Sequence, residues 1–317
     1  MTVQSISVRV LSKRIKAPGI AAYTLGAEGG QVLPDYAAGA HIDVKLPNGL
    51  IRQYSLCGDR ADPATYEIGV LRDGAGRGGS AYLHDTVREG DLLEIGEPRN
   101  LFPLTPARHS VLLAGGIGIT PLLAMARSLA TSGSSFEFHY FVRSEDRAAY
   151  WDTLSRLAPD EALYLHVGER IPASFAVARV LGAPSPDTHL YTCGPNPFMD
   201  AVLDLARSAG WDAANLHSER FAAVTGGDDQ PFELELAASG KVVQVSADQT
   251  AAEALALAGV RLPLSCEQGI CGTCLTTVLA GVPDHRDSYL SEDERLANDC
   301  FTPCRSRART PRLTINL

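Results

Sequence analysis

The stretch SCEQGICGTC at residues 265–274, together with CRSRA at residues 304–308, decides the fold of the C-terminal part of this chain. The cysteines in the two stretches are Cys266, Cys271, Cys274 and Cys304. The first three follow the spacing C-x4-C-x2-C, and twenty-nine residues separate the third from the fourth. Gly269 and Gly272 let the backbone turn tightly and point its amides at the sulfur atoms. Three close thiolates and one distant thiolate can therefore enclose a metal centre.

This spacing resembles that of a plant-type [2Fe-2S] ferredoxin, which indicates an electron carrier. A zinc site is a weaker alternative, because it usually pairs two C-x2-C knuckles and only Cys271 and Cys274 form one here. Cys300 competes for the role of fourth ligand. It would shorten the long loop to twenty-five residues, so the spacing favours Cys304. Cys57 follows an apolar stretch and is expected to be a small buried side chain.

Length, charge and composition narrow the class of protein. With 317 residues and 45% hydrophobic content, the chain can bury two or three cores. Its net charge is −9, and no Lys/Arg-rich tract is present to bind nucleic acid or anionic lipid. The acidity is greatest toward the C-terminus, where it either steers a basic protein partner or only aids solubility. Residues 1–14 contain no signal-peptide stretch and no long apolar run occurs, so we expect no disulfides, no membrane span and a cytoplasmic location.

The pattern of the sequence divides the chain into three segments, residues 1–105, 106–226 and 227–317. The first shows short alternating strands separated by turn residues, such as His41–Leu46 and Tyr66–Val70, and predicts an antiparallel barrel or sandwich. In the second, apolar strands alternate with helical stretches, which predicts a parallel α/β unit. The polar run Gly226–Pro231 is typical of a linker, so the third segment is expected to be a separate module.

Two motifs of the first segment indicate a site for a planar phosphorylated cofactor. Arg52-Gln53-Tyr54-Ser55 ends one strand, and Gly76-Arg77-Gly78-Gly79-Ser80 precedes a short helix predicted over residues 81–84. Ser80 is predicted to cap that helix, whose free amides suit a phosphate, and Arg52 or Arg77 would add a charged contact. Tyr54 offers a ring for stacking and Ser55 a hydrogen-bond donor. A glycine-rich hairpin turn would also explain the second motif, so only the two motifs in order support the prediction.

The second segment carries two turns, each directly after an apolar strand. In Gly115-Gly116-Ile117-Gly118-Ile119-Thr120-Pro121, the glycines let a dinucleotide pyrophosphate approach the backbone, and Thr120 is predicted to cap the next helix. This is not the G-x-G-x-x-G fingerprint, and a plain strand-to-helix turn remains the alternative. The other turn, Cys193-Gly194-Pro195, is expected at the same edge of the sheet. No neighbouring base supports Cys193 as a nucleophile, so we predict that it contacts a cofactor.

In this order, the Arg-x-Tyr-Ser, Gly-Arg-Gly-Gly-Ser, Gly-Gly-Ile-Gly-Ile-Thr-Pro and Cys-Gly-Pro motifs, followed by the cysteines, resemble the phthalate dioxygenase reductase family of the ferredoxin-NADP reductase superfamily. The resemblance spans nearly the whole chain and extends to vanillate demethylase reductases. It implies a multidomain fold. An antiparallel β-barrel would bind flavin over residues 1–105, and an α/β parallel-sheet domain would bind nicotinamide over 106–226. A C-terminal α+β β-grasp domain, plant-type ferredoxin in kind, would span 227–317.

The resemblance also implies roles for individual residues. Those that would hold the flavin are Arg52, Tyr54, Ser55, Val70, Leu71, Arg72, Arg77, Gly78, Gly79 and Ser80. Those that would meet the nicotinamide nucleotide are Gly116, Gly118, Thr120, Cys193, Gly194 and Pro195. Phe221 would shield the flavin where the nicotinamide enters, with a plain core role as the alternative. The hydride-transfer site would then comprise Ser55, Cys193 and Phe221.

The implied cluster ligands are Cys266, Cys271, Cys274 and Cys304. The ending Cys304-Arg305-Ser306-Arg307-Ala308 supports Cys304 over Cys300, which stands where a polar residue is expected. Three histidines, His41, His84 and His285, are predicted to make structural hydrogen bonds, because hydride transfer to flavin needs no protein acid or base at the carbon.

The implied activity is an NADH-dependent reductase that splits a hydride into single electrons and delivers them to the Rieske centre of an aromatic-ring dioxygenase or O-demethylase. FMN is favoured over FAD because the family uses it, and NADH over NADPH because no basic cluster follows Pro195. The alternatives are a reductase of a hybrid-cluster or haem protein and a non-catalytic redox-sensing module. A monomer is expected, since a carrier must dock transiently, whereas the oxygenase and its substrate are unreadable from this chain.

Overall fold

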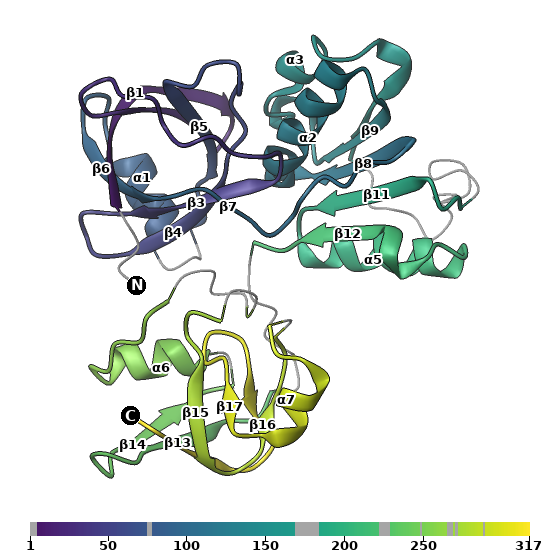
Figure 1. The fold of residues 1–317 in the computed structure, drawn as a ribbon. Helices are drawn as coiled ribbons and strands as arrows, with labels where there is room; N and C mark the ends of the chain where they lie inside the picture. Colours follow the sequence, from purple (N-terminus) through teal and green to yellow (C-terminus); the bar gives the residue numbers. More distant parts are fainter. Residues whose placement is uncertain are drawn as a thin grey trace. The chain divides into compact units, whose positions relative to one another are not determined.

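The computed structural model describes residues 5–74, 78–168, 184–221, 229–247, 249–264, 269, 272–287 and 289–317. Within it the chain forms two compact units, Met1–Arg220 and Phe221–Leu317 (Figure 1). The domain boundaries predicted at residues 105 and 226 stay predictions. Among the described residues, no helix has the length and apolar character needed to cross a membrane.

The first unit begins with an antiparallel sheet that curls into a barrel (Figure 1). Its strands are β1 (Ser5–Ala17), β2 (Ile20–Ala27), β3 (Ala40–Lys45), β4 (Ile51–Ser55), β5 (Thr65–Leu71), β6 (Leu92–Gly96) and β7 (Arg99–Asn100). The order is β4-β3-β6-β1-β2-β5, with β7 beside β3. An isolated bridge between Leu56 and Ile68 joins the end of β4 to β5 and closes the barrel. Helix α1 (Gly79–Asp85) follows β5, and the Lys13 ammonium caps its C-terminal end by donating to the carbonyls of Leu83 and His84.

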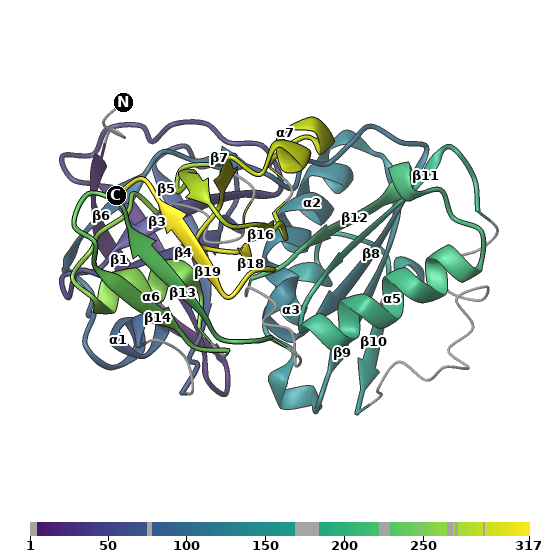
Figure 2. The same cartoon turned by 90° about the horizontal axis from the view of Figure 1, so that it is seen from below.

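The second half of the first unit is a parallel sheet with helices on both faces. Its elements are β8 (His109–Gly115), α2 (Ile119–Ser132), β9 (Ser135–Val142), α3 (Trp151–Leu154), β10 (Leu163–Val167), β11 (Thr188–Cys193), α5 (Asn196–Ser208) and β12 (Leu216–Glu219). The strand order β10-β9-β8-β11-β12 reverses direction of growth at β8, as in doubly wound sheets. Helix α5 covers one face, and α2 and α3 cover the other (Figure 2). Loops after β8 and β11 therefore meet at one edge.

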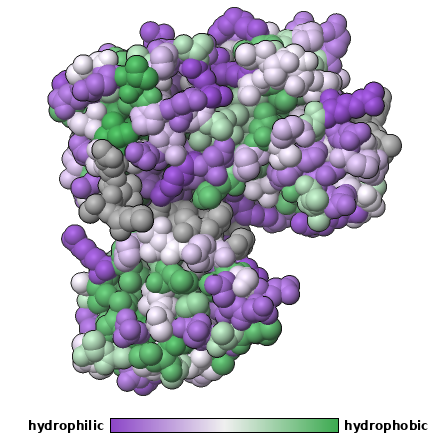
Figure 3. All heavy atoms as spheres, in the orientation of Figure 1, coloured by the Kyte–Doolittle hydropathy of each residue, from purple (hydrophilic) through white to green (hydrophobic). Residues whose placement is uncertain are grey.

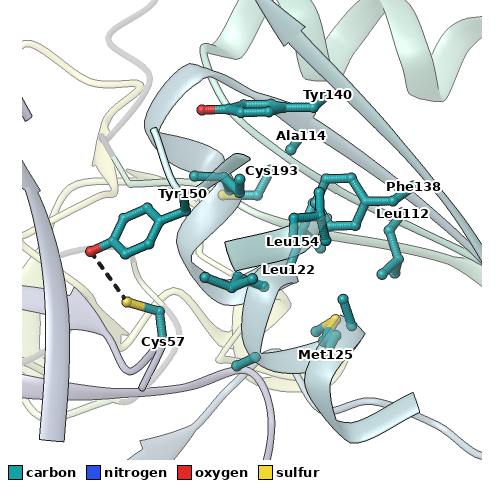
Figure 4. Close-up of a cluster of buried hydrophobic side chains, with 14 of the residues drawn as sticks. Cys57, Leu112, Ala114, Leu122, Met125, Phe138, Tyr140, Tyr150, Leu154 and Cys193 are labelled. Carbon is teal, nitrogen blue, oxygen red and sulfur yellow. Dashed lines mark hydrogen bonds between the residues drawn. The ribbon is translucent and has the colours of Figure 1, made fainter. Parts of the chain in front are cut away.

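The barrel and the parallel sheet share a hydrophobic core. One cluster of buried side chains includes Ile20 and Cys57 from the barrel together with Leu122 and Tyr140 from the α/β half (Figure 4). A second cluster fills the barrel itself, around Tyr23 and Ile42. The first cluster explains why these two halves form one compact unit, since neither could expose its part of that core to water without cost.

The second unit has its own core and a mixed sheet of order β14-β13-β19-β15-β17. Its elements are β13 (Phe232–Leu236), β14 (Val242–Val245), α6 (Ala251–Leu257), β15 (Thr276–Ala280), β16 (Pro283–Asp284), α7 (Glu292–Ala297), β17 (Cys300–Phe301), β18 (Arg307–Ala308) and β19 (Arg312–Ile315). Strands β13 and β19 pair in parallel, and α6 packs on the sheet. Thr250 with Glu253 and Ser291 with Glu294 form capping boxes that start α6 and α7. This is the β-grasp arrangement expected from the sequence.

The run predicted as a linker does not stay in solvent over its whole length. The Asp229 side chain is only 3% exposed and accepts two hydrogen bonds from the Arg286 guanidinium, at 2.5 and 3.0 Å. The buried Arg307 lies 3.6 Å away on the other side of the same carboxylate. Asp229 therefore belongs to the fold of the second unit, because a buried guanidinium pair needs a buried counter-charge.

Candidate functional site

The phosphate-binding motif and the Arg-x-Tyr-Ser strand lie together, as predicted. Glycine is required at position 79, because a Cβ there would lie 2.6 Å from Cγ and 2.7 Å from Nε of Arg52. The Arg52 side chain therefore passes directly over the first residue of α1. Gly78 precedes the helix with φ 79°, a left-handed conformation that favours glycine. Arg77 lies outside the described residues, so its predicted role is not placed.

The predicted cap of α1 is wrong. The helix begins at Gly79 with Gly78 as its N-cap, and Ser80 lies inside the first turn. The Ser80 hydroxyl instead accepts a hydrogen bond from the Asp73 amide at 3.0 Å, which ties the end of the β5 loop to the helix. Because no side chain caps α1, the backbone amides of its first turn are suited to bind an anionic ligand.

The strand before this loop is fixed by α1. The Val70 carbonyl lies 2.9 Å from His84 Nε2, which is the structural hydrogen bond predicted for that histidine. Arg72 and Asp85 form an ion pair at 2.8 Å, and this hydrogen-bonded guanidinium lowers the pKa of the exposed Asp85 carboxyl. Leu71 is partly exposed between them. The stretch 70–72 therefore has the fixed backbone that the flavin contact requires, while that contact itself stays a prediction.

The two turns of the α/β half meet backbone to backbone. A Cβ on Gly118 would lie 2.1 Å from the Cys193 carbonyl oxygen, and one on Gly194 would lie 2.9 Å from Gly115 Cα. Cys193 pairs in register with Ala114, so the loops after β8 and β11 share one sheet edge, as predicted. Only glycine allows this approach.

Thr120 does not cap α2, contrary to the prediction. The helix starts at Ile119 after a short 3-10 turn, η1 (Gly116–Gly118), and Gly118 is its N-cap. The Thr120 hydroxyl donates to the Ile117 carbonyl at 3.1 Å. The helix start therefore lies two residues earlier than the capping signal suggested, because Thr and Ser hydroxyls also bond carbonyls within a helix.

A buried carboxylate that sequence reasoning missed lies between these loops and the barrel. Glu219, the last residue of β12, accepts a hydrogen bond from the Ser55 hydroxyl at 3.5 Å and lies 3.9 Å from His41 Nδ1. It pairs in register with Cys193. Burial raises the pKa of Glu219 to about 8, even though the Ser55 hydrogen bond lowers it. Ser55 and Cys193, predicted from separate motifs, thus meet around one protonatable group.

One signal could have pointed to Glu219. It sits two residues before Phe221 at the end of a strand of the parallel sheet, where polar side chains gather at the ligand-binding edge. Burial raises the pKa of the neighbouring Cys193 thiol well above its usual range, which argues against a nucleophile. Its contact with a cofactor stays a prediction. Phe221 is 42% exposed and falls in the second unit, so its role at the flavin stays a prediction.

Two of the four predicted cluster ligands are placed, and they are neighbours. The Sγ atoms of Cys274 and Cys304 lie 3.2 Å apart, both residues are buried, and they form no disulfide. Cys300, the rival for fourth ligand, sits on β17 opposite Thr277. Burial raises the pKa of its thiol to about 11. Cys266 and Cys271 lie outside the described residues.

The loop around the thiols is shaped by the two glycines predicted to be necessary. Gly269 and Gly272 have φ of 73° and 68°. A Cβ on Gly272 would fall 2.2 Å from the Tyr289 ring, and one on Gly269 would fall 2.9 Å from Cβ of Asp287. Asp287 is buried and holds the loop by accepting from Ser306 Oγ at 3.0 Å. Paired buried thiols in a close-packed glycine loop are the donor set that a [2Fe-2S] cluster uses.

His285 does not make the structural hydrogen bond predicted for it. Its side chain is buried, and among the described residues neither ring nitrogen has a hydrogen-bond partner. Nδ1 lies 3.7 Å from the Asp287 carboxylate. This distance is beyond hydrogen-bonding range, so the prediction is wrong for this histidine.

Comparison with known proteins agrees with this geometry. Residues 234–309 match the 2Fe-2S iron-sulfur cluster binding domain family, and residues 98–216 match the family described as dimethylamine monooxygenase subunit DmmA-like, N-terminal domain. The vanillate O-demethylase oxidoreductase of Pseudomonas putida is 47% identical, over 98% of this chain and 100% of its own. The heme-dependent oxidative N-demethylase beta subunit of Ectopseudomonas mendocina is 42% identical, over 95% and 96%.

A solved structure gives the same result for the whole chain. Phthalate dioxygenase reductase, described as a modular structure for electron transfer from pyridine nucleotides to [2Fe-2S], is 36% identical. It matches with a TM-score of 0.78 over 99% of this chain and 98% of its own. The predicted fold class, with barrel, parallel α/β sheet and ferredoxin module, is confirmed by this match and by the cluster-binding family. The chain therefore belongs to the phthalate dioxygenase reductase family of oxidoreductases.

Proposed function

We propose that this protein is the NADH-dependent reductase component of a Rieske oxygenase that acts on an aromatic acid. The preferred oxygenase is an O-demethylase. One observation carries the proposal. The flavin-side Ser55 and the nicotinamide-side Cys193 meet at the buried Glu219, in a chain that also pairs Cys274 with Cys304. These are the parts that hydride acceptance and single-electron delivery need, and the relatives named above are oxygenase components over their whole length.

The residues of the first unit would divide the binding work. Arg52 and the amides at the start of α1 would hold the flavin phosphate, and Tyr54 would pack on the ring system. Gly116, Gly118 and Thr120 would line the path of the nucleotide. When bound, the flavin supplies the chemistry by taking a hydride from the nicotinamide and passing its electrons singly to the cluster.

At the site of hydride transfer, the protein itself would contribute a carboxyl group that keeps its proton. With a pKa of about 8, Glu219 is largely protonated at neutral pH, at a carboxyl oxygen within reach of the Ser55 hydroxyl. That pair would present a neutral hydrogen-bonding group beside the flavin and would exclude a buried negative charge while a hydride approaches. Cys193, neutral for the same reason of burial, would contact the nicotinamide without reacting.

The nucleotide choices rest on what surrounds the two sites. FMN is proposed because the phthalate dioxygenase reductase family uses it, and FAD is the alternative. NADH is proposed because no basic cluster follows Cys193-Gly194-Pro195, whereas Arg143 and Arg147, exposed after β9, would be the groups available to a 2′-phosphate. Acid release of the flavin followed by mass spectrometry distinguishes FMN from FAD. A ratio of kcat/KM for the two nucleotides that favours NADPH would overturn the second choice.

The second unit has an exit surface through which electrons would pass to an acceptor protein, formed by Tyr289 and α7. Tyr289 lies directly over Gly272 in the cysteine loop and is about half exposed. Helix α7, which follows it, carries Glu292 and Asp293 on its first turn and the largely exposed Leu296 on its last. Hydrophobic and hydrophilic residues lie side by side on the face of this unit that Figure 3 shows. An acceptor with a basic rim around an apolar centre would fit such a surface.

A haem protein is the second candidate acceptor, because the Ectopseudomonas mendocina relative at 42% identity is named as part of a heme-dependent N-demethylase. The first candidate is preferred because the 47% identical relative is a vanillate O-demethylase oxidoreductase. We also propose that the protein is a cytoplasmic monomer, which size-exclusion chromatography with light scattering would check.

The test is anaerobic mixing of the purified holoprotein with NADH. The flavin absorption and then the cluster absorption should bleach, and adding a purified vanillate-type Rieske oxygenase should restore both as its Rieske centre is reduced. Absence of bleaching would end the reductase proposal. Bleaching followed by transfer to a haem oxygenase, with none to a Rieske protein, would select the second acceptor.

A further inference from the structure

Tyr150 marks the place where the two halves of the first unit are pinned together. It precedes α3 and has φ 63° and ψ 7°, a left-handed conformation. Among the described residues, only one other non-glycine residue, Asn298, has a positive φ. A bulky side chain in this conformation costs on the order of 1 kcal/mol, so its surroundings must hold it there. Such residues gather at functional sites, which makes the contacts of Tyr150 informative.

The side chain of Tyr150, which comes from the α/β half, contacts residues of the barrel within the shared core. Its ring is buried, and its hydroxyl lies 3.7 Å from Sγ of Cys57, which follows β4 (Figure 4). The Lys16 ammonium at the end of β1 lies 4.9 Å from the ring centroid, within cation–π range. Cys57 is completely buried in the core that the two halves share. The tyrosine is thus held from three directions by residues of the barrel and of its own helix.

The Tyr150 side chain packs against Gly69 of β5. A Cβ at position 69 would lie 3.0 Å from the Tyr150 hydroxyl and 2.7 Å from Cγ2 of Thr120. Strand β5 therefore contacts the start of α2 directly, one residue before the stretch 70–72 that is predicted to meet the flavin. Thr120 belongs to the turn predicted to meet the nicotinamide. The two cofactor-facing segments touch at this single glycine.

We propose that Gly69 and Tyr150 are positioning residues that set the distance between bound flavin and bound nicotinamide. This inference rests on the proposed function, because it assigns a spacing to the hydride-transfer pair. Gly69 sets the closest approach of β5 to Thr120, and Tyr150 locks the α/β half at that approach through Cys57. Neither residue needs to touch a cofactor. Their effect would be exerted through Val70 on one side and Thr120 on the other.

Hydride transfer is the step that the contact of Gly69 with Tyr150 and Thr120 would control. Reacting atoms must come within about 3 to 3.5 Å, and a displacement of about 1 Å can cost a hundredfold in rate. Adding a methyl group at Gly69 forces Thr120 to move by several tenths of an ångström, since Cβ contacts below 3.0 Å do not persist. Burial raises the pKa of Cys57 to about 12 and that of Tyr150 well above its usual value, so these two side chains stay neutral across the working pH range.

The decisive experiment compares Gly69→Ala with Gly96→Ala in the holoprotein. Gly96 ends β6 of the same barrel, and a Cβ there would have its nearest neighbour at 3.6 Å, an ordinary contact. Rapid mixing with NADH should show flavin bleaching about tenfold slower in Gly69→Ala and unchanged in Gly96→Ala. The deuterium isotope effect with NADH labelled at C4 should rise in Gly69→Ala only, because the donor–acceptor distance grows.

A rescue variant separates positioning from loss of structure. Gly69→Ala combined with Thr120→Ser removes the methyl group that the new Cβ would meet at 2.7 Å, and it should recover most of the lost rate. Tyr150→Phe keeps the ring but removes the bond to Cys57, and it should slow bleaching by about threefold with a raised isotope effect. If Gly69→Ala does not fold, Tyr150→Phe decides the matter by the same two measurements.

Two results would overturn the proposal. One is Gly69→Ala bleaching as fast as Gly96→Ala with an unchanged isotope effect. The other is slow bleaching that the Thr120→Ser rescue does not restore, since the cause would then lie elsewhere. Failure of the proposed function looks different, because the unsubstituted protein would not bleach with NADH at all.

Discussion

The two units of this protein solve different problems of cofactor placement. In the first, a barrel and a parallel sheet share buried side chains such as Cys57 and Leu122, and glycines bring their loops into contact. In the second, a small mixed sheet has a core of its own around Leu234 and Leu313. A hydride must pass between groups in contact, whereas single electrons need no contact between the exchanging atoms. This difference accounts for the core that the barrel and the parallel sheet share and for the separate core of the second unit.

The largest effect is expected from Cys304→Ser, which separates the units functionally. Loss of one of four thiolates should abolish the cluster's visible absorption and its electron paramagnetic resonance signal. Flavin bleaching by NADH should continue at the unsubstituted rate, while reduction of any oxygenase stops. Cys300→Ser is the matched control and should keep the cluster. A cluster that survives Cys304→Ser and disappears in Cys300→Ser would reverse the ligand assignment.

Removing the buried counter-charge of the second unit should test its independence. Asp229→Ala removes the carboxylate that Arg286 and Arg307 both face. Arg286 keeps its ion pair with Asp284 at 2.6 Å, so the expected cost is about 3 kcal/mol. The expected readout is a fall in the unfolding temperature of the second unit alone, followed by cluster absorption, with the flavin-reporting transition unmoved. Glu233→Ala removes a solvent-exposed ion pair with Arg312 and should lower the unfolding temperature far less. Coupled shifts of both transitions after Asp229→Ala would contradict the picture of two separate cores.

Glu219→Gln should change how the stability of the first unit depends on pH. In the folded state Glu219 keeps its proton up to about pH 8, whereas the unfolded chain releases it near pH 4.5. The stability of the first unit should therefore fall as pH rises through this window, by an amount on the order of 5 kcal/mol. The glutamine variant cannot ionise and should lose that slope. Thermal unfolding followed by flavin fluorescence at several pH values measures it, and an identical slope in both proteins would refute the assignment.

The smallest effect is expected at the proposed exit surface. Reversing charge with Glu292→Lys and Asp293→Lys on α7 should raise the KM for the oxygenase several-fold at low salt, corresponding to about 1 kcal/mol. Flavin bleaching and the cluster spectrum should not change. The same reversal at Glu28, exposed on the barrel, serves as control. A loss of acceptor affinity that is equal for both sites, or that persists undiminished in high salt, would argue against specific docking at α7.

Much of this site could be predicted, because its motifs are local. A close approach to the backbone is predicted for the turn that contains Gly118, and a Cβ there would lie 2.1 Å from the Cys193 carbonyl oxygen. The helix caps were less predictable. Ser80 and Thr120 lie where capping residues often occur, yet each helix starts one residue or more earlier, since a hydroxyl can bond within the turn as easily as at its end.

The sequence by itself determined the order of the modules, the cysteine loop and the two glycine turns predicted to meet cofactors, because these depend on spacing and on glycine along a short stretch of chain. Only the tertiary structure decided which distant residues share a site. Glu219 meets Ser55 across 164 positions of sequence, Cys57 meets Tyr150 across 93, and Asp229 meets Arg286 across 57. Burial and charge pairing at such separations are properties of packing, and packing is set by the whole fold rather than by any local pattern.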